Sequence, residues 1–90
     1  MAVDVRFSAQ ASIELESAFV WYENQKPGLG FSFLKAAEDA IAKIKANPKR
    51  YSSARPPIRH YHLQRFPFTI FYTADDSIWI AAVWHQKRKR

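Results

Sequence analysis

Three histidines and several arginines in the second half of the chain are side chains that could act on an anionic substrate. His60 and His62 are separated by one residue in the strand-like segment 58–63, and His85 ends a later strand-like run. Cleavage of RNA needs a base for the 2′-hydroxyl, cations for the phosphate in its transition state, and an acid for the leaving oxygen. Grouped near one groove with Arg59 or Arg65, the three histidines would be acid–base candidates and the arginine would stabilise the phosphate.

The same residues also have simpler interpretations. A His-x-His pair on an exposed strand is more often part of a solvated surface than of a catalytic centre. His85, beside Trp84, fits a structural hydrogen-bonding role as well as it fits a site. The residues alone leave both interpretations open.

Metal and cofactor sites are not expected. His-x-His can bind zinc, but the nearby carboxylates, Asp75 and Asp76, are in a turn and the chain has no cysteine. Gly28 and Gly30 lie between two predicted helices rather than after a strand, so they do not form a phosphate-binding loop.

The positive charge is concentrated in the second half of the chain. Residues 1–47 carry five Lys or Arg against six Asp or Glu, whereas residues 48–90 carry nine basic residues against only Asp75 and Asp76. Such asymmetry within one domain predicts a face built for an anionic partner. The alternative is a solvated surface that ends in a basic tail at residues 86–90, a segment that is a candidate for disorder.

Length and composition indicate one domain over residues 1–90. The chain is 48% hydrophobic and 16% aromatic, which is enough for a single modest core. No apolar run approaches the roughly 20 residues that span a bilayer, so no membrane association is expected. The N-terminal residues lack a signal-peptide pattern and cysteine is absent, so we expect a cytoplasmic protein.

The first half predicts a strand and a helical hairpin. Val3, Val5 and Phe7 alternate with polar residues as in a half-buried strand, and Ser8 is a plausible N-cap for the helix that follows. Residues 27–30, Pro-Gly-Leu-Gly, end that helix, and a second one runs to Asn47-Pro48. The aromatic residues of both helices are expected in the core: Phe19, Trp21, Tyr22, Phe31 and Phe33.

The second half predicts a loop over 49–57 and strands over 58–63, 67–73 and 78–84. The run from Trp79 to Trp84 is apolar on both faces, which is typical of a strand in the middle of a sheet. The fold class is therefore α+β, in the order β-α-α-β-β-β, with a helical hairpin on one face of a small, mostly antiparallel sheet. Alternation in 58–63 places Tyr61 and Leu63 on the buried side and both histidines on the open face.

The order and spacing of short motifs along almost the whole chain resemble the RelE/ParE superfamily of toxins from type II toxin–antitoxin systems. The motifs are Val5-x-Phe7-Ser8-x-x-Ala11, Trp21-Tyr22-Glu23, Pro27-Gly28-Leu29-Gly30-x-x-Phe33-Leu34, Ile44-x-x-Asn47-Pro48, Ile58-Arg59, Arg65-Phe66-Pro67-Phe68-x-Ile70-x-Tyr72 and Val83-x-His85-x-x-Arg88. The resemblance implies a small toxin whose active surface is masked by a cognate antitoxin. It also implies one of two targets: messenger RNA on the ribosome for RelE-like members, or DNA gyrase for ParE-like members.

Departures from the RelE pattern favour the ParE-like branch. RelE-like nucleases carry two lysines where this chain has His60 and His62, and their catalytic arginine corresponds to about Thr69. Their C-terminal aromatic residue has no counterpart before Lys87-Arg88-Lys89-Arg90. The Arg65-Phe66-Pro67-Phe68 motif is closer to the ParE-like pattern, although Phe68 replaces the commoner tyrosine.

The favoured hypothesis is thus a ParE-like toxin that binds DNA gyrase without hydrolysis and is neutralised by an acidic antitoxin. The residues expected to contact the target or the antitoxin are Arg59, Arg65, Trp84, His85, Lys87 and Arg88. The alternatives are a ribosome-dependent mRNA endonuclease that uses His60, His62 and His85, a non-toxic relative that retains only antitoxin binding, and a basic nucleic-acid-binding module.

Overall fold

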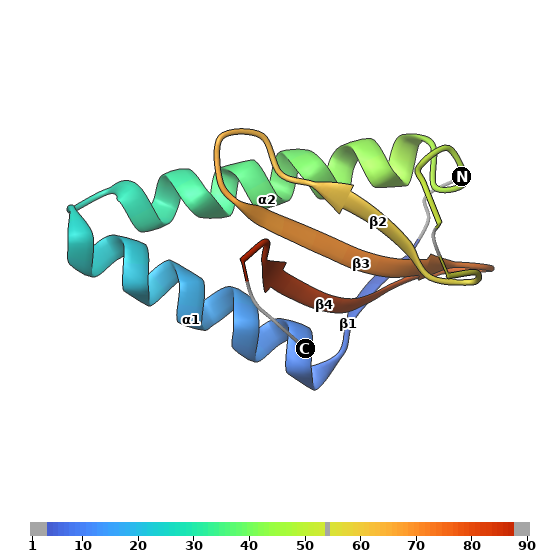
Figure 1. Cartoon of the computed structure of the whole chain (residues 1–90), viewed down its shortest axis with the longest axis horizontal. Coiled ribbons are helices and arrows are strands. Elements are labelled where there is room, and N and C mark those ends of the chain that lie inside the picture. The colour runs from blue at the N-terminus through green and yellow to red at the C-terminus, as the bar shows by residue number, and fades with distance from the viewer. Residues whose placement is uncertain (1–3, 54, 88–90) are drawn as a thin grey trace.

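A computed structural model describes residues 4–53 and 55–87 of the chain. The described elements are β1 (Val5–Phe7), α1 (Ala9–Gln25), α2 (Leu29–Ala46), β2 (Arg59–His62), β3 (Phe68–Ala74) and β4 (Ile78–His85) (Figure 1). The predicted order, β-α-α-β-β-β, is confirmed, and the strand boundaries differ from the predicted ones by a residue at most ends.

The four strands form one mixed sheet in the order β1-β4-β3-β2. β4 is parallel to β1 and antiparallel to β3, which in turn is antiparallel to β2. The apolar run of β4 is therefore at the centre of the sheet, as its composition predicts. Its two faces are not equally buried, however, because Trp79 is 43% exposed.

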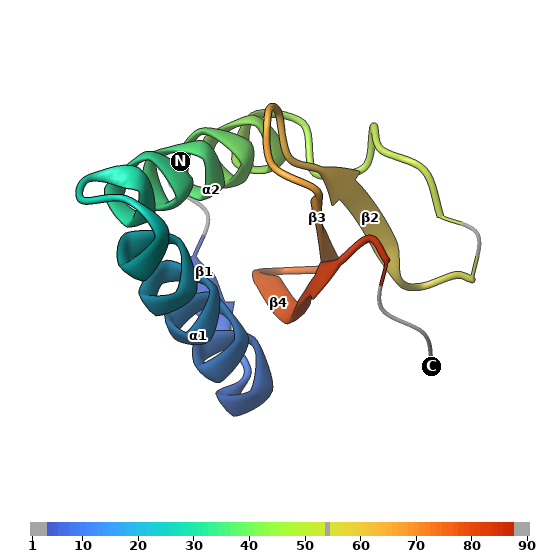
Figure 2. The ribbon, with the colours of Figure 1, turned by 60° about the vertical axis from the view of Figure 1, so that its left-hand side comes forward.

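Both helices cover the same face of the sheet and leave the other face open (Figure 2). α1 begins at the predicted cap: the Ser8 hydroxyl oxygen accepts the Ala11 backbone N–H at 2.9 Å, which satisfies one of the free first-turn donors. α2 ends at Ala46, with Asn47 as its C-cap and Pro48 directly after it.

The corner between the helices is held by one carboxylate and one close contact. The Glu23 carboxylate accepts the backbone N–H groups of Gly28 and Gly30, at 2.8 and 2.9 Å. Gly28 adopts φ +91°, a backbone conformation that residues other than glycine rarely adopt. A Cβ on Gly30 would lie 2.7 Å from the Phe19 carbonyl oxygen, so glycine is what lets α2 approach α1 here.

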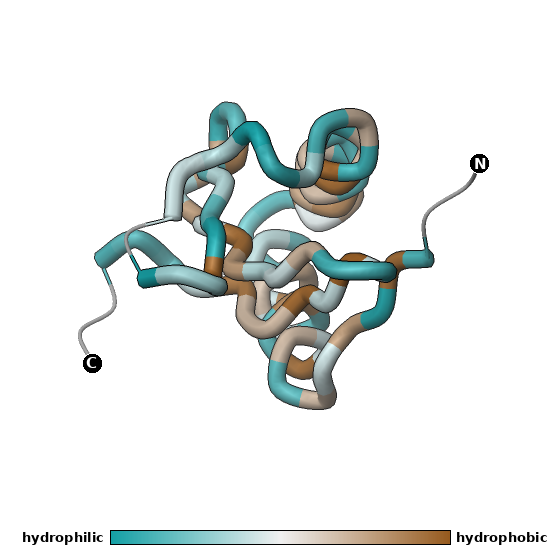
Figure 3. Tube along the Cα trace, turned by 90° about the vertical axis from the view of Figure 1, so that its right-hand side faces the viewer, coloured by the Kyte–Doolittle hydropathy of each residue, from teal (hydrophilic) through white to brown (hydrophobic). Residues whose placement is uncertain are grey.

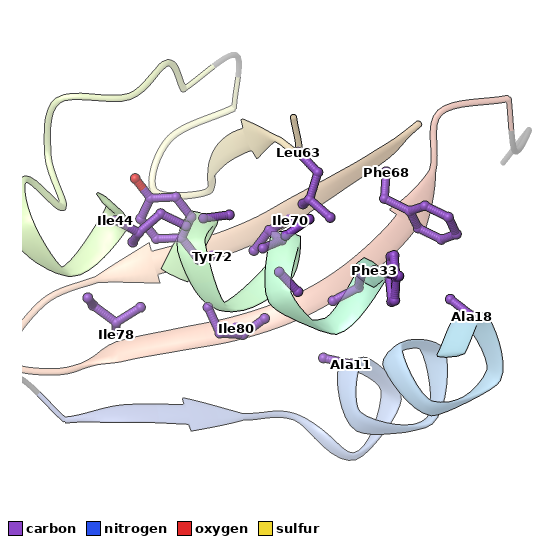
Figure 4. Close-up of a cluster of buried hydrophobic side chains, with 14 residues drawn as sticks. Ala11, Ala18, Phe33, Ile44, Leu63, Phe68, Ile70, Tyr72, Ile78 and Ile80 are labelled. Carbon is purple, nitrogen blue, oxygen red and sulfur yellow. The ribbon is translucent and has the colours of Figure 1, made fainter. Parts of the chain in front are cut away.

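The core lies between the helices and the sheet. In Figure 3 the hydrophobic stretches gather toward the middle of the molecule, and the longest hydrophilic stretches lie toward its periphery. Phe33 of α2 and Phe68 of β3 are neighbours in this core, with ring centroids 5.1 Å apart (Figure 4). The largest fully buried side chains are Tyr72, Phe33, Ile44, Ile70, Ile78, Ile80 and Val83.

The expectation that all five helical aromatic residues are core residues is wrong for three of them, because Phe19 is half-buried outside the core cluster and two others are exposed. Phe33 is fully buried and Tyr22 packs against the core, but Trp21 is 59% exposed and Phe31 is 63% exposed. Trp21 lies one residue off the buried stripe of α1. Phe31 lies in the first turn of α2, where its ring forms a T-shaped pair with Phe19, with centroids 5.0 Å apart. Within the described residues, neither helix is long and apolar enough to cross a membrane.

Candidate functional site

The open face of the sheet contains a pocket of about 300 Å³. It is lined by Arg55, Ile58, His60, Phe71, Ala81, Ala82 and Trp84. Its floor is apolar, and its polar groups, a guanidinium and an imidazole, are both basic. The sequence predicted His60 and Trp84 at such a surface and missed Arg55, which a nonregular loop brings to the rim.

Strand register explains which side chains meet on this face. His60 is opposite Phe71 and His62 is opposite Thr69 in the β2–β3 ladder, and Thr69 is opposite Trp84 in the β3–β4 ladder. Aromatic and imidazole rings consequently form a row across three strands. Their centroids are 5.2 Å apart for His60 and His62, 6.4 Å for His60 and Phe71, and 5.6 Å for Phe71 and Trp84.

Both histidines lie on the open face, as predicted, and Leu63 on the opposite side is buried. His62 is exposed, whereas His60 is half-buried. The His62 Nδ1 atom lies 2.6 Å from the Thr69 hydroxyl oxygen, so one ring nitrogen of His62 is hydrogen-bonded to a side chain of β3. Thr69, which is 5% exposed, therefore serves as a hydrogen-bonding partner inside the sheet.

His85 does not join the other two histidines. Its ring packs on the edge of Phe68 at 5.2 Å, and Phe68 packs against Phe33 and Tyr22 under the helices. The His85 Nδ1 atom accepts the Lys87 backbone N–H at 3.1 Å. The expectation of three histidines near one groove is thus wrong for His85, which lies on the helix-covered side.

A β-bulge in β4 causes this separation. Tyr72 is opposite Ile80 and Phe71 is opposite Ala82, so Ala81 is an extra residue in the ladder. Ile80 is fully buried under the helices, and strict alternation from it would carry His85 to the open face. The extra residue reverses the pattern beyond it, so Val83 and His85 face the helices and Trp84 faces the open side.

The predicted basic contact residues are spread over the molecule. The Arg59 guanidinium donates to the Tyr51 backbone oxygen at 2.9 Å and so ties the 49–57 loop to β2. Arg65 is in the β2–β3 turn with φ +70° and lies beside α2, lining a surface hollow with Asp39 and Lys43. Lys87 is exposed after β4, and Arg88 lies outside the described residues.

Two tyrosines between the helices and the sheet have raised pKa values. Burial raises the pKa of Tyr22, and burial also raises the pKa of Tyr72, an effect that the positive charge of Arg59 partly opposes. The Tyr72 hydroxyl donates to the Pro48 backbone oxygen at 2.7 Å. These groups belong to the core and do not reach the open face.

Sequence reasoning also missed a buried carboxylate. Glu14 on α1 is 7% exposed, and its Oε1 atom accepts the Val83 backbone N–H of β4 at 2.7 Å. Its position beside the apolar residues of α1 is the signal that could have revealed it, because an acidic residue within a buried stripe needs a hydrogen-bonding partner. Among the described residues, no group of three or more His, Asp or Glu side chains is arranged to hold a metal ion.

Comparison with known proteins assigns the family. The family model described as the ParE toxin of the type II toxin–antitoxin system parDE matches residues 5–90, so the chain belongs to the ParE toxin family. It is a toxin of the RelE/ParE superfamily, as the sequence motifs indicated. No curated protein was found to match the sequence.

A solved structure of the chromosomal ParDE toxin–antitoxin system from P. aeruginosa has the same fold. It superposes with a TM-score of 0.68 at 19% sequence identity, over 93% of this chain and 96% of that one. At this identity the match supports the arrangement of the elements and carries no information about individual site residues.

Proposed function

We propose that this protein arrests growth by binding DNA gyrase and that a cognate antitoxin neutralises it. Membership of the ParE toxin family supports a toxin of a type II toxin–antitoxin pair. The observation that favours binding over hydrolysis is the position of the three histidines, because His60 and His62 lie on the open face and His85 packs on Phe68 beneath the helices. His85 is therefore too far round the sheet to act with His60 and His62 on one phosphate, and one ring nitrogen of His62 is already hydrogen-bonded to the Thr69 hydroxyl.

The pocket on the open face is the proposed contact surface. Phe71, Trp84 and Ile58 supply apolar walls for a bulky side chain of the partner, and the rim carries the positive charge of Arg55 and the polar imidazole of His60. Buried aromatic anchors of this kind account for much of the affinity at protein interfaces. An antitoxin segment that joins an apolar residue to Asp or Glu matches these walls and this rim.

The remaining predicted contact residues take secondary positions in this proposal. Lys87 and Arg88 would extend the positive surface beyond the end of β4, and such exposed charges chiefly raise association rates. His85 would support the end of β4 by packing on Phe68. Arg59 and Arg65 would hold the loop and turn at the two ends of β2.

A gyrase supercoiling assay with the purified chain tests the proposed target. Inhibition of supercoiling with accumulation of cleaved DNA is expected, and a Trp84→Ala variant should need at least about tenfold more protein, as for loss of an aromatic anchor. A chain that folds normally and leaves supercoiling unaffected at any concentration would exclude gyrase as the target.

A ribosome-dependent nuclease is the second candidate, because the His60 and His62 rings lie 5.2 Å apart on the open face with Arg55 lining the same pocket as His60. That pair could supply an acid and a base. Incubation with translating ribosomes and sequencing of the transcript ends tests it. Codon-phased cuts that disappear in the His60→Ala, His62→Ala double variant would favour the nuclease over the gyrase inhibitor.

A further inference from the structure

The bulge at Ala81 decides which side chains the open face presents. Without the extra residue, alternation from Ile80 would direct Trp84 toward the helices and would leave Val83 and His85 on the open face. The pocket would then lose its largest aromatic wall. Because a bulge leaves backbone groups outside the normal ladder, something must bind them for the bulge to persist.

Two side chains, Ser8 at the N-cap of α1 and Glu14 within α1, bind backbone groups at the bulge and just beyond it. The Ser8 hydroxyl donates to the Ala81 backbone oxygen at 2.8 Å, while the Ser8 backbone N–H donates to the Ile80 oxygen at 2.9 Å. The Glu14 carboxylate accepts the Val83 N–H at 2.7 Å. Together these contacts span the β4 segment in which the register changes.

The Glu14 contact is unusual in its burial. A carboxylate that is 7% exposed has lost most of its hydration, and this is tolerated where hydrogen-bond donors replace the water. The Val83 N–H supplies one donor to Oε1, and the Gln10 side-chain amide supplies another to Oε2 at 2.8 Å. A leucine at position 14 would continue the apolar stripe of α1 without any such requirement.

We infer that Ser8 and Glu14 are positioning residues for the open-face pocket: they hold the bulge at Ala81 and thereby place Trp84 on that face. Neither residue lines the pocket. Their effect on binding rests on the proposed function of the pocket, whereas their effect on the register of β4 does not. Loss of the Glu14 acceptor should therefore alter Trp84 before any partner is added.

The test uses full-length protein in a Trp21→Phe, Trp79→Phe background. Both residues are substantially exposed, at 59% and 43%, and their replacement leaves Trp84 as the single fluorescent indole. In Glu14→Leu, amide exchange at Val83, followed by NMR, should be at least about tenfold faster, as expected for loss of a buried hydrogen bond. Acrylamide quenching of Trp84 should change in the same variant.

Three further variants separate positioning from general destabilisation. Glu14→Gln keeps an oxygen acceptor and should restore slow exchange at Val83, whereas Ser8→Ala should alter Trp84 quenching as Glu14→Leu does. Ile44→Val removes a core methyl group of α2, leaves the hydrogen bonds of Ser8 and Glu14 in place, and lowers stability by about 1 kcal/mol. It should leave both Val83 exchange and Trp84 quenching as in the parent.

The last measurement is the potency of gyrase inhibition. Glu14→Leu should lose at least about tenfold in potency, and Ile44→Val should lose less than about twofold. If the parent itself does not inhibit gyrase, the proposed target fails, and the exchange and quenching data still decide the role of Glu14. Unchanged exchange and quenching in Glu14→Leu, or equal changes in Ile44→Val, would overturn the inference.

Discussion

Trp84 and His85 are adjacent in the chain, yet their rings lie on opposite faces of the sheet. The Trp84 ring contacts Phe71 at 5.6 Å on the open face, and the His85 ring contacts Phe68 at 5.2 Å on the helix-covered face. This arrangement leaves His60 and His62 without the third histidine, and His60 shares its pocket with apolar side chains and Arg55. It favours a surface that binds a partner.

The first prediction compares two tryptophans. Trp84→Ala should weaken binding of gyrase or antitoxin by at least about tenfold, because it removes an aromatic wall of the pocket. Trp21→Ala, on the exposed side of α1, is the matched control and should change the affinity by less than about twofold. Titration calorimetry measures both. Equal losses for the two variants would argue against the open-face pocket as the contact surface.

The second prediction compares two phenylalanines of α2. Phe33→Ala should lower the free energy of unfolding by about 3–5 kcal/mol, since Phe33 is fully buried against Phe68. Phe31→Ala should cost about 1 kcal/mol or less, because Phe31 is 63% exposed and its ring forms a T-shaped pair with Phe19 at the helix corner. Urea denaturation gives both values, and a similar cost at the two positions would contradict the assigned core.

The third prediction concerns the helix corner. Gly30→Ala should destabilise the fold by about 1–3 kcal/mol, because a Cβ would lie 2.7 Å from the Phe19 carbonyl oxygen and force the helices apart. Gly28→Ala has free space around the new methyl group, so only the strain of φ +91° opposes it, at a cost of about 1 kcal/mol. Thermal unfolding should rank Gly30→Ala below Gly28→Ala, and the reverse order would reject the close approach.

The fourth prediction concerns alkaline pH. Burial raises the pKa of Tyr72 in the folded state, so the folded protein holds this proton more tightly than the unfolded chain does. The resulting stabilisation is complete below the ordinary tyrosine pKa of about 10 and is lost as the pH rises above it. Urea denaturation between about pH 9 and pH 11 covers both sides of that pKa. Over this range the parent should lose stability more steeply than Tyr72→Phe.

Tyr72→Phe also loses the hydrogen bond to the Pro48 oxygen, which should cost about 1 kcal/mol near neutral pH. Tyr22, whose pKa is raised by burial as well, contributes to the same alkaline loss. Parallel stability curves for the parent and a Tyr22→Phe, Tyr72→Phe double variant would show that neither hydroxyl is linked to folding.

The order of the elements could be predicted from short sequence patterns, because neighbouring residues in the chain mark where the helices begin and end and which strand is central. Ser8 caps α1, Asn47 and Pro48 end α2, and the apolar run of β4 lies at the sheet centre. The position of His85 could not be obtained this way. The extra residue at Ala81 depends on contacts with Ser8 and Glu14, which are about seventy residues away in the chain.

The exposure of Phe31 was also beyond local patterns, because it depends on how α1 and α2 pack at Gly30 and Phe19. Trp21, by contrast, lies one residue off the buried stripe of α1, and helical spacing alone could have indicated its exposure. Arg55 reaches the pocket from a loop whose path depends on tertiary contacts, such as that between Arg59 and the Tyr51 oxygen. Long-range contacts of this kind determine the site, whereas short-range patterns determine the elements.

The most direct test of the proposed function is tightly controlled expression of the chain in bacterial cells, with DNA breaks and transcripts followed in the same culture. We expect growth arrest with gyrase-linked double-strand breaks and intact messenger RNA, and relief of both effects in cells that carry a toxin-resistant gyrase. Growth arrest with codon-phased transcript cleavage and unbroken DNA would contradict the account.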